Sequence, residues 1–324
     1  MGYVIRFSRT GGPEVLQIEE TAIGEPGPGE ARVRHKAVGL NYVDTYQRSG
    51  RYPVTLPSGL GTEGAGIVEA AGAGVTDIRE GDRVAYATGP LGAYADVRIM
   101  PAERLVKLPA GIGFDQAAAM MLKGMTAQYL LRQTCKVKPG DAILIHAAAG
   151  GVGLIVCQWA KLLGATVIGT VGSEEKAALA KAHGCDHPIL YTRENFLERV
   201  KALTGGEGVP VVYDSVGKDT FADSLACLRP FGMLVSFGQS SGTVPPFDIS
   251  ELSRRGSLFL TRPTLYTYGA KRADLLAMAG DLFDVVQSGK VRIEIGQRYP
   301  LRDAAQAHRD LEARRTTGST ILLP

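Results

Sequence analysis

The segment from Asp141 to Gly164, DAILIHAAAGGVGLIVCQWAKLLG, restricts the fold more than any other part of the chain. A short apolar run, a turn of small residues and a helical apolar spacing follow one another, which predicts strand, turn and helix. In the fingerprint G-x-G-x-x-G, the middle glycine lets the backbone approach a pyrophosphate, and the last lets the helix pack on the strand. Gly150 and Gly153 hold those two places, with Ala148 where the first glycine would be. The segment predicts a dinucleotide site, and a purely structural turn is the alternative.

The rest of this region alternates strands and helices, which is typical of a parallel sheet with right-handed crossovers. Together with the strand at 143–146, the expected strands number six, enough for one complete dinucleotide-binding unit. The further strands are expected at 166–170, 187–190, 209–214, 233–237 and 257–261, and the helices at 154–163, 174–182, 193–203 and 219–228.

The first third of the chain reads as short strands separated by Gly-Pro turns, which indicates a compact, partly open β-barrel. The strands are expected at 3–7, 14–19, 30–38, 65–71, 82–87 and 93–100, and a helix at 113–131. After the parallel sheet we expect a helix at 270–288, a strand at 291–295, an amphipathic helix at 301–314 and a strand at 319–323. Since a six-stranded sheet is already full, this last strand is expected to rejoin the N-terminal domain.

Composition limits the function classes. A chain of 324 residues with 45% apolar residues fits a globular protein of two domains. A net charge of +3 is too small to argue for nucleic acid. The chain has no apolar window of about 20 residues, and its first residues lack the apolar core of a signal peptide. Its four cysteines form no C-x-x-C pair. We therefore expect a cytoplasmic protein without a disulfide.

The end of the second sheet strand bears on cofactor choice. NAD-selective sites usually carry a carboxylate there, for the ribose 2′-hydroxyl, and Val171–Gly172 has none. Ser173 and Lys176 are instead suited to a 2′-phosphate. We interpret Glu174 and Glu175 as first-turn residues of the next helix, capped by Ser173. The pattern favours NADPH over NADH.

Several motifs together carry a family resemblance over essentially the whole chain. They are GGPEVL (11–16), GLNYVDTYQRSGRYP (39–53), GTEGAGIV (61–68), EGDRV (80–84), HAAAGGVG (146–153) and YDSVG (213–217). The chain resembles quinone oxidoreductases of the zeta-crystallin type, in the medium-chain dehydrogenase/reductase superfamily. The alanine-first turn Ala147-x-x-Gly150-x-x-Gly153 is that family's form of the fingerprint.

The resemblance implies an α/β fold of two domains. A Rossmann-type domain with a six-stranded parallel sheet would span 123–265, and a GroES-like, partly open β-barrel catalytic domain would span 1–122 and 266–324. The implied activity is NADPH:quinone oxidoreduction in the cleft between them. Zinc enzymes of the superfamily place a cysteine near Asn41 and a His–Glu pair near Thr62–Glu63. This chain lacks both, so we expect no bound metal.

Without a metal, carbonyl reduction relies on cofactor position and a hydrogen-bond donor. Within the loop expected at 41–52, Tyr46 and Tyr52 are predicted to donate to a quinone oxygen, and their alternative role is as rim or core aromatics. Asn41 is expected to hold an oxygen or the nicotinamide amide. Asp44 is interpreted as a structural hydrogen-bond partner. Lys123 is interpreted as a solvated helix residue, with a place near the nicotinamide as the alternative.

The resemblance also implies cofactor contacts and an assembly. The cofactor-binding residues would be Asn41, Gly150, Gly151, Val152, Gly153, Ser173, Lys176, Tyr191, Val216, Phe237, Gly238, Ser240, Thr264 and Leu265. The family is commonly dimeric through its sixth sheet strand, here 258–261, so we expect a homodimer.

Three other functions remain open. An NADPH-dependent alkenal or enone reductase would use the same site, because enals and quinones are both flat conjugated electrophiles. A serine hydrolase would use Ser240 in Gly238-x-Ser240-x-Gly242, followed by Asp303 and His308, but a nucleophile elbow must open a helix, and Thr-Val-Pro-Pro follows. Single-stranded RNA binding would be a secondary activity at most, since no RNA motif is present.

Overall fold

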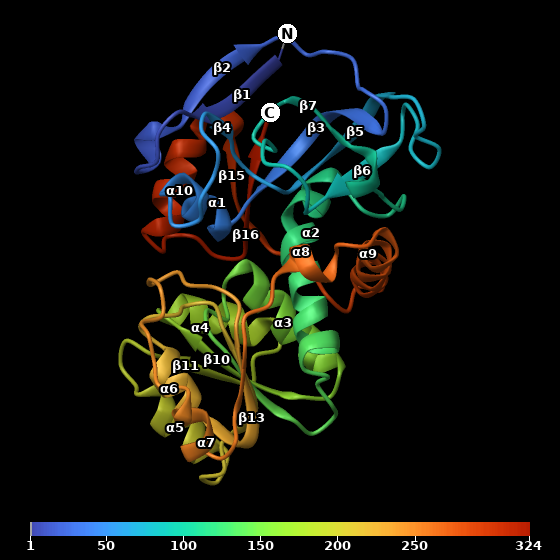
Figure 1. The fold of residues 1–324 in the computed structure, drawn as a ribbon. Coiled ribbons are helices and arrows are strands. Elements are labelled where there is room, and N and C mark those ends of the chain that lie inside the picture. The colour runs from blue at the N-terminus through green and yellow to red at the C-terminus, as the bar shows by residue number, and fades with distance from the viewer. Residues whose placement is uncertain (1) are drawn as a thin grey trace. The chain divides into compact units, whose positions relative to one another are not determined.

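The computed structural model describes residues 2–324 and divides the chain into two compact units. One, here named the barrel unit, contains the chain up to Met125 together with Gly269–Gln287 and Ile293–Pro324. The other, the sheet unit, contains Thr126–Tyr268 and Ser288–Arg292. Figure 1 colours the chain by residue number, and each unit is described by itself below.

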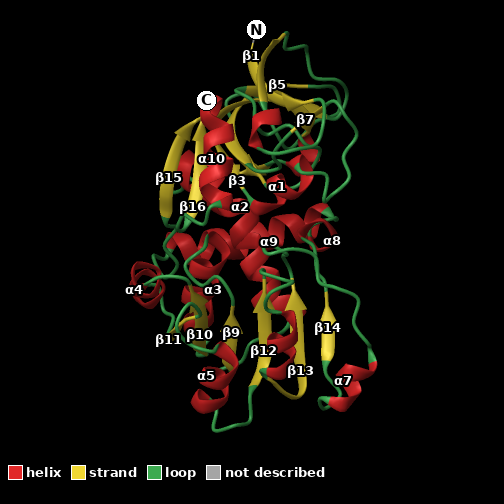
Figure 2. Ribbon diagram, turned by 90° about the vertical axis from the view of Figure 1, so that its left-hand side faces the viewer, coloured by secondary structure: helices red, strands yellow, loops and turns green. Residues whose placement is uncertain are grey.

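The sheet unit is built on six parallel strands in the order β11-β10-β9-β12-β13-β14 (Figure 2). The strands are β9 (Ala142–Ile145), β10 (Thr166–Val171), β11 (His187–Leu190), β12 (Val209–Asp214), β13 (Leu228–Ser236) and β14 (Phe259–Thr261). The helices are α3 (Gly151–Leu162), α4 (Glu174–Ala182), α5 (Phe196–Leu203), α6 (Phe221–Ala226), α7 (Ser250–Arg254) and α8 (Leu265–Tyr268). Strand order reverses beside β9, as in a doubly wound dinucleotide-binding sheet. The predicted six-stranded Rossmann-type sheet is confirmed.

Local sequence explains several of these boundaries. Ser173 caps α4, because its hydroxyl accepts the Lys176 backbone N–H. Asn195 caps α5 by accepting two backbone N–H groups with its side-chain oxygen. Gly164 ends α3 at a φ of +85°, a conformation that glycine adopts without strain. Apolar side chains of the strands and helices then close a core that includes Leu144, Val212 and Leu234.

The barrel unit contains two sheets. One has the order β2-β1-β4, and the other has the order β15-β16-β3-β5-β6-β8, with β7 paired to β3. Its strands are β1 (Gly2–Phe7), β2 (Gln17–Thr21), β3 (Glu30–Leu40), β4 (Ser58–Gly59), β5 (Gly64–Ala71), β6 (Arg83–Tyr86), β7 (Val97–Pro101), β8 (Val106–Lys107), β15 (Ile295–Pro300) and β16 (Ser319–Leu323). The C-terminal β16, red in Figure 1, pairs antiparallel with β3. This pairing confirms that the last strand rejoins the N-terminal domain.

The helices of the barrel unit frame these sheets. They are α1 (Tyr42–Arg48), α2 (Phe114–Tyr129, whose last residues belong to the sheet unit), α9 (Arg272–Gln287) and α10 (Ala304–Glu312). The single-turn helices are η1 (Pro13–Val15), η2 (Ala102–Arg104) and η4 (Leu301–Asp303), and a π-helical turn, η3 (Leu130–Thr134), follows α2 in the sheet unit.

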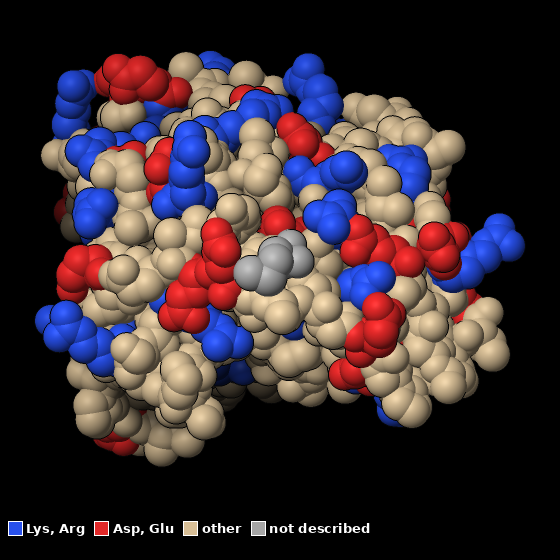
Figure 3. Space-filling model, turned by 90° about the horizontal axis from the view of Figure 1, so that it is seen from above, with Lys and Arg blue, Asp and Glu red and all other residues tan. Residues whose placement is uncertain are grey.

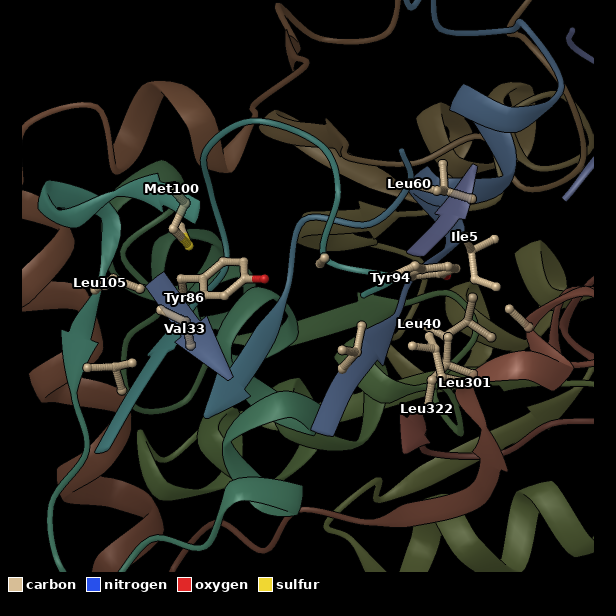
Figure 4. Packing of buried hydrophobic residues seen from close by; sticks show 14 of the residues in the cluster. Ile5, Val33, Leu40, Leu60, Tyr86, Tyr94, Met100, Leu105, Leu301 and Leu322 are labelled. Carbon is tan, nitrogen blue, oxygen red and sulfur yellow. The ribbon is translucent and has the colours of Figure 1, made fainter. Parts of the chain in front are cut away.

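The core of the barrel unit is apolar and draws on both ends of the chain. Figure 4 shows Ile5, Leu40 and Leu60 gathered near Tyr94, with Leu301 and Leu322 from the C-terminal segment beside them. A second group surrounds the Tyr86 ring and includes Val33, Met100 and Leu105. All of these side chains are buried. Burying such groups contributes about 1.5–3 kcal/mol per large side chain, so the C-terminal segment is a stabilising part of this unit.

Several predicted bounds of secondary structure differ from the structure, and three of the differences have a clear physical cause. The loop expected at 41–52 contains α1, because the Asp44 carboxylate accepts the Asn41 backbone N–H and starts a helix. The strand expected at 14–19 begins only at Gln17, since Pro13 favours a helical turn first. The strand expected at 291–295 lies at Ile295–Pro300, where it pairs with β16.

No helix among residues 2–324 is long and apolar enough to cross a membrane. On the face drawn in Figure 3, basic and acidic side chains are interspersed instead of being separated by sign.

Candidate functional site

The predicted glycine turn lies between β9 and α3 at the carboxyl edge of the sheet. Gly150 is the N-cap residue of α3, and Ala147 has a φ of +55°. A Cβ atom added to Gly153 would overlap the Ala147 carbonyl oxygen and lie 2.7 Å from that of Ala148. Only glycine therefore lets the first turn of α3 pack on this backbone. The half-buried Gly151 and Val152 begin the helix, where backbone N–H groups have no helical partner and favour an anion.

A buried polar network that the sequence did not reveal supports this turn. The His146 ring nitrogens lie 2.9 Å from the Thr170 hydroxyl and 2.9 Å from the Ser224 hydroxyl. Ser224 donates to the Asp214 carboxylate, which also accepts the Val216 N–H. Burial lowers the pKa of His146, so the neutral ring is favoured. The network ties together the carboxyl ends of β9, β10 and β12.

The group predicted for a 2′-phosphate lies at the ends of β10 and β11. Ser173 and Lys176 are half-buried at the start of α4, and a Cβ on Gly172 would lie 2.6 Å from the Tyr191 hydroxyl. The Tyr191 side chain thus covers the end of β10 while remaining 43% exposed. Glu174 is a first-turn residue, as predicted, and its carboxylate pairs with Arg193 at 2.7 Å.

The predicted contacts after β12 and β13 also lie together. The N–H groups of Phe237 and Gly238 donate to the Asp214 carbonyl, and Ser240 N–H donates to the Ser215 carbonyl. Arg262 donates to the Gly238 carbonyl at 3.0 Å, which holds this loop against the end of β14.

The predicted turn at Thr264–Leu265 opens the short helix α8. Leu265 is buried and Thr264 is exposed. The Thr264 carbonyl accepts the Thr267 N–H, and the ring of Tyr268 stacks on Tyr129 at 4.5 Å. These contacts give the segment after β14 a fixed path within the sheet unit.

In the barrel unit, Asn41 is the N-cap residue of α1 and the centre of a buried hydrogen-bond cluster. Its backbone N–H donates to the Asp44 carboxylate at 2.8 Å, and its side-chain amide donates to Glu63 Oε2 at 2.7 Å. The fully buried Glu63 also accepts the Leu122 N–H at 2.7 Å and the Lys123 ammonium at 3.2 Å. We name Asn41, Asp44, Glu63 and Lys123 the Asn41 cluster.

The structure of the Asn41 cluster tests the predicted roles of Asp44 and Lys123. Asp44 is confirmed as a hydrogen-bond partner, since it accepts Asn41 N–H and the Tyr94 hydroxyl. Burial raises the pKa of Asp44 to about 7, against the opposing effect of those two hydrogen bonds and Lys123. The interpretation of Lys123 as solvated was wrong. Its side chain is 8% exposed, because the fully buried Glu63 carboxylate attracts the ammonium inward.

Asp44 is joined to the surface by a polar chain. Arg48 lies 2.9 Å from His308 Nδ1, and Tyr94 lies 3.1 Å from His308 Nε2. Arginine only donates, so Nδ1 must accept and Nε2 must carry the proton. Burial and the neighbouring Arg48 lower the pKa of His308 to about 3. Arg48 also pairs with Glu312 at 2.7 Å, which joins α1 to α10.

The two predicted tyrosines lie together but in different surroundings. Their rings make an edge contact at 5.2 Å between centroids. Tyr46 is 5% exposed, with Arg51 over its ring, whereas Tyr52 is half-buried. Tyr46 therefore has the surroundings of a core aromatic, and Tyr52 is the more exposed of the two residues.

The serine hydrolase alternative is not supported. Ser240 is not followed by a helix, since the next helix, α7, begins at Ser250. Both ring nitrogens of His308 are engaged by Arg48 and Tyr94.

Among residues 2–324, no three or more His, Cys, Asp or Glu side chains form a group that could hold a metal ion.

Two family profiles match the chain. Residues 27–110 match the Alcohol dehydrogenase GroES-like domain, and residues 151–273 match the Zinc-binding dehydrogenase family. The quinone oxidoreductase of Pseudomonas aeruginosa is 58% identical over 321 residues, which cover 99% of each chain. A 2-haloacrylate reductase of a Burkholderia species is 50% identical over 98% of this chain and 97% of its own.

Structural comparison agrees with these matches. The crystal structure of Escherichia coli quinone oxidoreductase complexed with NADPH superposes with a TM-score of 0.98 at 50% sequence identity. The superposition covers 99% of this chain and 100% of the E. coli chain. With the six-stranded sheet, the GroES-like match and these relatives taken together, the chain belongs to the quinone oxidoreductases of the medium-chain dehydrogenase/reductase superfamily.

Proposed function

We propose that the protein is an NADPH-dependent oxidoreductase that reduces quinones. The glycine turn at the carboxyl edge of the sheet is the observation that carries the proposal, because Gly153 leaves room that any side chain would fill. The similarity to quinone oxidoreductases, one of them complexed with NADPH, supports the same activity. NADPH supplies the hydride when it is bound.

The cofactor would be held by residues that this edge presents. Gly150, Gly151, Val152 and Gly153 would bind the pyrophosphate through backbone N–H groups. Ser173, Lys176 and Tyr191 would hold the 2′-phosphate. The strand end at Val171–Gly172 offers no carboxylate to repel it. The remaining proposed contacts are Val216, Phe237, Gly238, Ser240, Thr264, Leu265 and Asn41.

The acceptor would be bound by the barrel unit. Tyr52 would donate to a substrate oxygen as negative charge builds there, while Tyr46 would hold the Tyr52 ring by packing. Asn41, fixed by Glu63, would position an oxygen or the nicotinamide amide. The catalytic part would comprise 1–122 and 266–324, and the nucleotide part 123–265.

An activated alkene is the alternative acceptor. The observation that favours it is the 50% identity to a 2-haloacrylate reductase. Quinones and 2-haloacrylates are both conjugated electrophiles, so one hydride donor can serve either.

The deciding experiment compares acceptors and cofactors on chelator-treated protein. NADPH and NADH oxidation would be followed with 1,4-benzoquinone, a naphthoquinone, an aliphatic enal and 2-chloroacrylate. The proposal expects NADPH-dependent turnover that is fastest with the quinones. Faster reduction of the enal or chloroacrylate would move the function to alkene reduction. No turnover with any acceptor would contradict the catalytic assignment, even if NADPH binds.

We also propose a cytoplasmic homodimer. Its four cysteines are free, which suits a reducing compartment. Among the strands of residues 2–324, β14 is hydrogen-bonded to β13 alone and so presents an open edge. Phe259 on this strand is 54% exposed. Pairing of two β14 edges would cover this surface and extend the sheet.

A further inference from the structure

Lys123 is the buried cation of the barrel unit with the most unused hydrogen-bonding capacity. It lies in the middle of α2, and Glu63 Oε2 is its one hydrogen-bond partner among the described residues. An ammonium carries three N–H donors, so two remain. Arg48 and Arg98 are the other buried lysine or arginine residues within 2–324, and each donates to several acceptors.

Unused donors at such a depth imply an acceptor that the chain itself does not provide. A buried donor without a partner costs about 1–3 kcal/mol. Lys123 is 6% exposed as a whole residue, and the Glu63 carboxylate beneath it is sealed from solvent. One N–H of the ammonium is therefore held by Glu63, and the other two can donate to a ligand that binds from the solvent side.

The local backbone is built to hold the ammonium there. Glu63 Oε1 accepts the Leu122 N–H of α2. The Ser319 hydroxyl of β16 donates to the Ala119 carbonyl of the same helix at 2.8 Å. A Cβ added to Gly39 would overlap both Glu63 and the Ala118 carbonyl. Strand β3 and helix α2 can thus close around Glu63 only because Gly39 has no side chain.

Lys123 also lies beside the residue already proposed to position the substrate. Its ammonium and the Asn41 amide both donate to the same oxygen, Glu63 Oε2, at 3.2 and 2.7 Å. An acceptor oxygen near Asn41 is therefore near Lys123. Glu63 fixes both donors by accepting them at one oxygen.

We propose that Lys123 is a catalytic residue whose ammonium binds the acceptor oxygen and protonates it. This inference rests on the proposed quinone reduction. Hydride addition brings two electrons and one proton to the quinone and leaves a hydroquinone anion. One Lys123 N–H bond then breaks as the O–H bond of the hydroquinone forms, and the neutral amine regains its proton from water. A cation at this place stabilises the developing oxyanion before the proton moves.

The charged and titratable groups around Lys123 come from several elements. Glu63 faces it directly, and Asp44 on α1 interacts with it through space. Asp44 accepts a hydrogen bond from the Tyr94 hydroxyl, which is itself hydrogen-bonded to His308 on α10. Tyr86, which bonds to His35 and Arg98, is the remaining titratable group influenced by Glu63.

A double variant separates catalysis from simple charge pairing. Lys123→Met alone leaves Glu63 buried and unpaired, which endangers folding. Lys123→Met combined with Glu63→Gln removes both charges and keeps an acceptor for Asn41. The pair Lys107→Met with Asp82→Asn is the matched control, because it removes a 2.9 Å ion pair at the surface of the same unit.

The readouts are kcat, the KM values for NADPH and quinone, thermal melting and rescue by added ethylammonium. With a folded double variant, we expect kcat to fall about 100-fold, the usual contribution of a general acid. NADPH KM should be unchanged, and ethylammonium should restore part of the rate. The surface control should match the wild type.

Three outcomes are distinguishable. A folded double variant with wild-type kcat would show that Lys123 only neutralises Glu63 and would overturn this inference alone. A slow double variant that ethylammonium does not rescue would assign Lys123 a structural role and overturn it as well. If the wild-type protein oxidises NADPH with none of the tested acceptors, the proposed function is overturned, and this inference with it.

Discussion

Asp44 uses one carboxylate oxygen for two hydrogen bonds, from Asn41 N–H and the Tyr94 hydroxyl, while its other oxygen is buried without a partner. Such an arrangement holds Asn41 at the start of α1 but makes the charged form of the carboxyl costly. The residue sequence Asn-x-x-Asp predicts the cap, whereas the burial that raises the pKa depends on Tyr94 and His308, which are distant in sequence. The sequence alone therefore identifies Asp44 as a hydrogen-bond partner of Asn41, but it does not reveal the raised pKa of the carboxyl.

Asp44→Asn is expected to change how stability depends on pH. The pKa of Asp44 rises from 3.8 when unfolded to about 7 when folded, so the folded protein binds an extra proton in that window. Stability from this group is therefore lost as pH rises from about 4 to about 7. The Asp44→Asn variant has no carboxyl at this position and so does not lose this stability. Between about pH 4 and about pH 7, its unfolding free energy relative to the wild type should therefore rise by about 4 kcal/mol, at about 1.4 kcal/mol per pKa unit.

Urea unfolding of both proteins at pH 4 and pH 8 measures this difference. His35 and His308, whose pKa values are lowered to about 4 and about 3, contribute the opposite slope below pH 6.5. They are present in both proteins, so comparing variant with wild type cancels them. An advantage that does not change with pH would contradict the raised pKa of Asp44.

Gly153→Ala is expected to weaken NADPH binding at least tenfold and to destabilise the protein. The added methyl group would overlap the Ala147 carbonyl oxygen, so the glycine turn and α3 must separate. Gly280→Ala is the matched control, because a Cβ there, in helix α9, meets nothing within 4 Å and should stabilise by up to about 1 kcal/mol. Fluorescence titration with NADPH and thermal melting give both quantities. Equal NADPH affinity in the two variants would refute the role of the turn.

At the scale of elements, the sequence predicted what local signals determine. Helix α4 has the predicted bounds, since the Ser173 hydroxyl caps its first turn. The parallel sheet of six strands followed from the alternation of strands and helices. Strand β15 lies later than expected because its place is set by pairing with β16, and no signal within residues 291–300 reports a partner strand.

The cap of α4 also belongs to the proposed 2′-phosphate group, so Ser173→Ala should have two effects. Loss of the hydrogen bond from the Lys176 N–H is expected to cost about 1 kcal/mol of stability. Loss of the hydroxyl should raise KM for NADPH while leaving KM for NADH nearly unchanged. The control is Asn195→Ala at the cap of α5, which removes a cap without touching the phosphate group. Equal changes in both KM values would show that Ser173 acts only as a cap.

At the scale of the whole molecule, the sequence predicted two domains and the return of the last strand to the N-terminal domain, where β16 pairs with β3. The Asn41 cluster was only half predicted. Asn41 and Asp44 lie within one motif, but their link to Glu63, and from there to Lys123, joins segments about 20 and 60 residues apart. A lysine inside a helix gives no local sign that a buried carboxylate will meet it, so its burial follows only from the packing of α2 on β3.

The predicted assembly can be tested at one edge of the sheet. Phe259→Asp places a charge on β14, where it would have to be buried against the partner strand, so the homodimer should dissociate to monomers. Ile18→Asp is the matched control. Ile18 is 52% exposed on β2, an edge strand that already carries Glu19 and Glu20 and so resists pairing. Light scattering after size-exclusion chromatography should give a dimer for the wild type and Ile18→Asp, and a monomer for Phe259→Asp. A dimer in all three would place the subunit contact away from β14, and a monomeric wild type would refute the dimer.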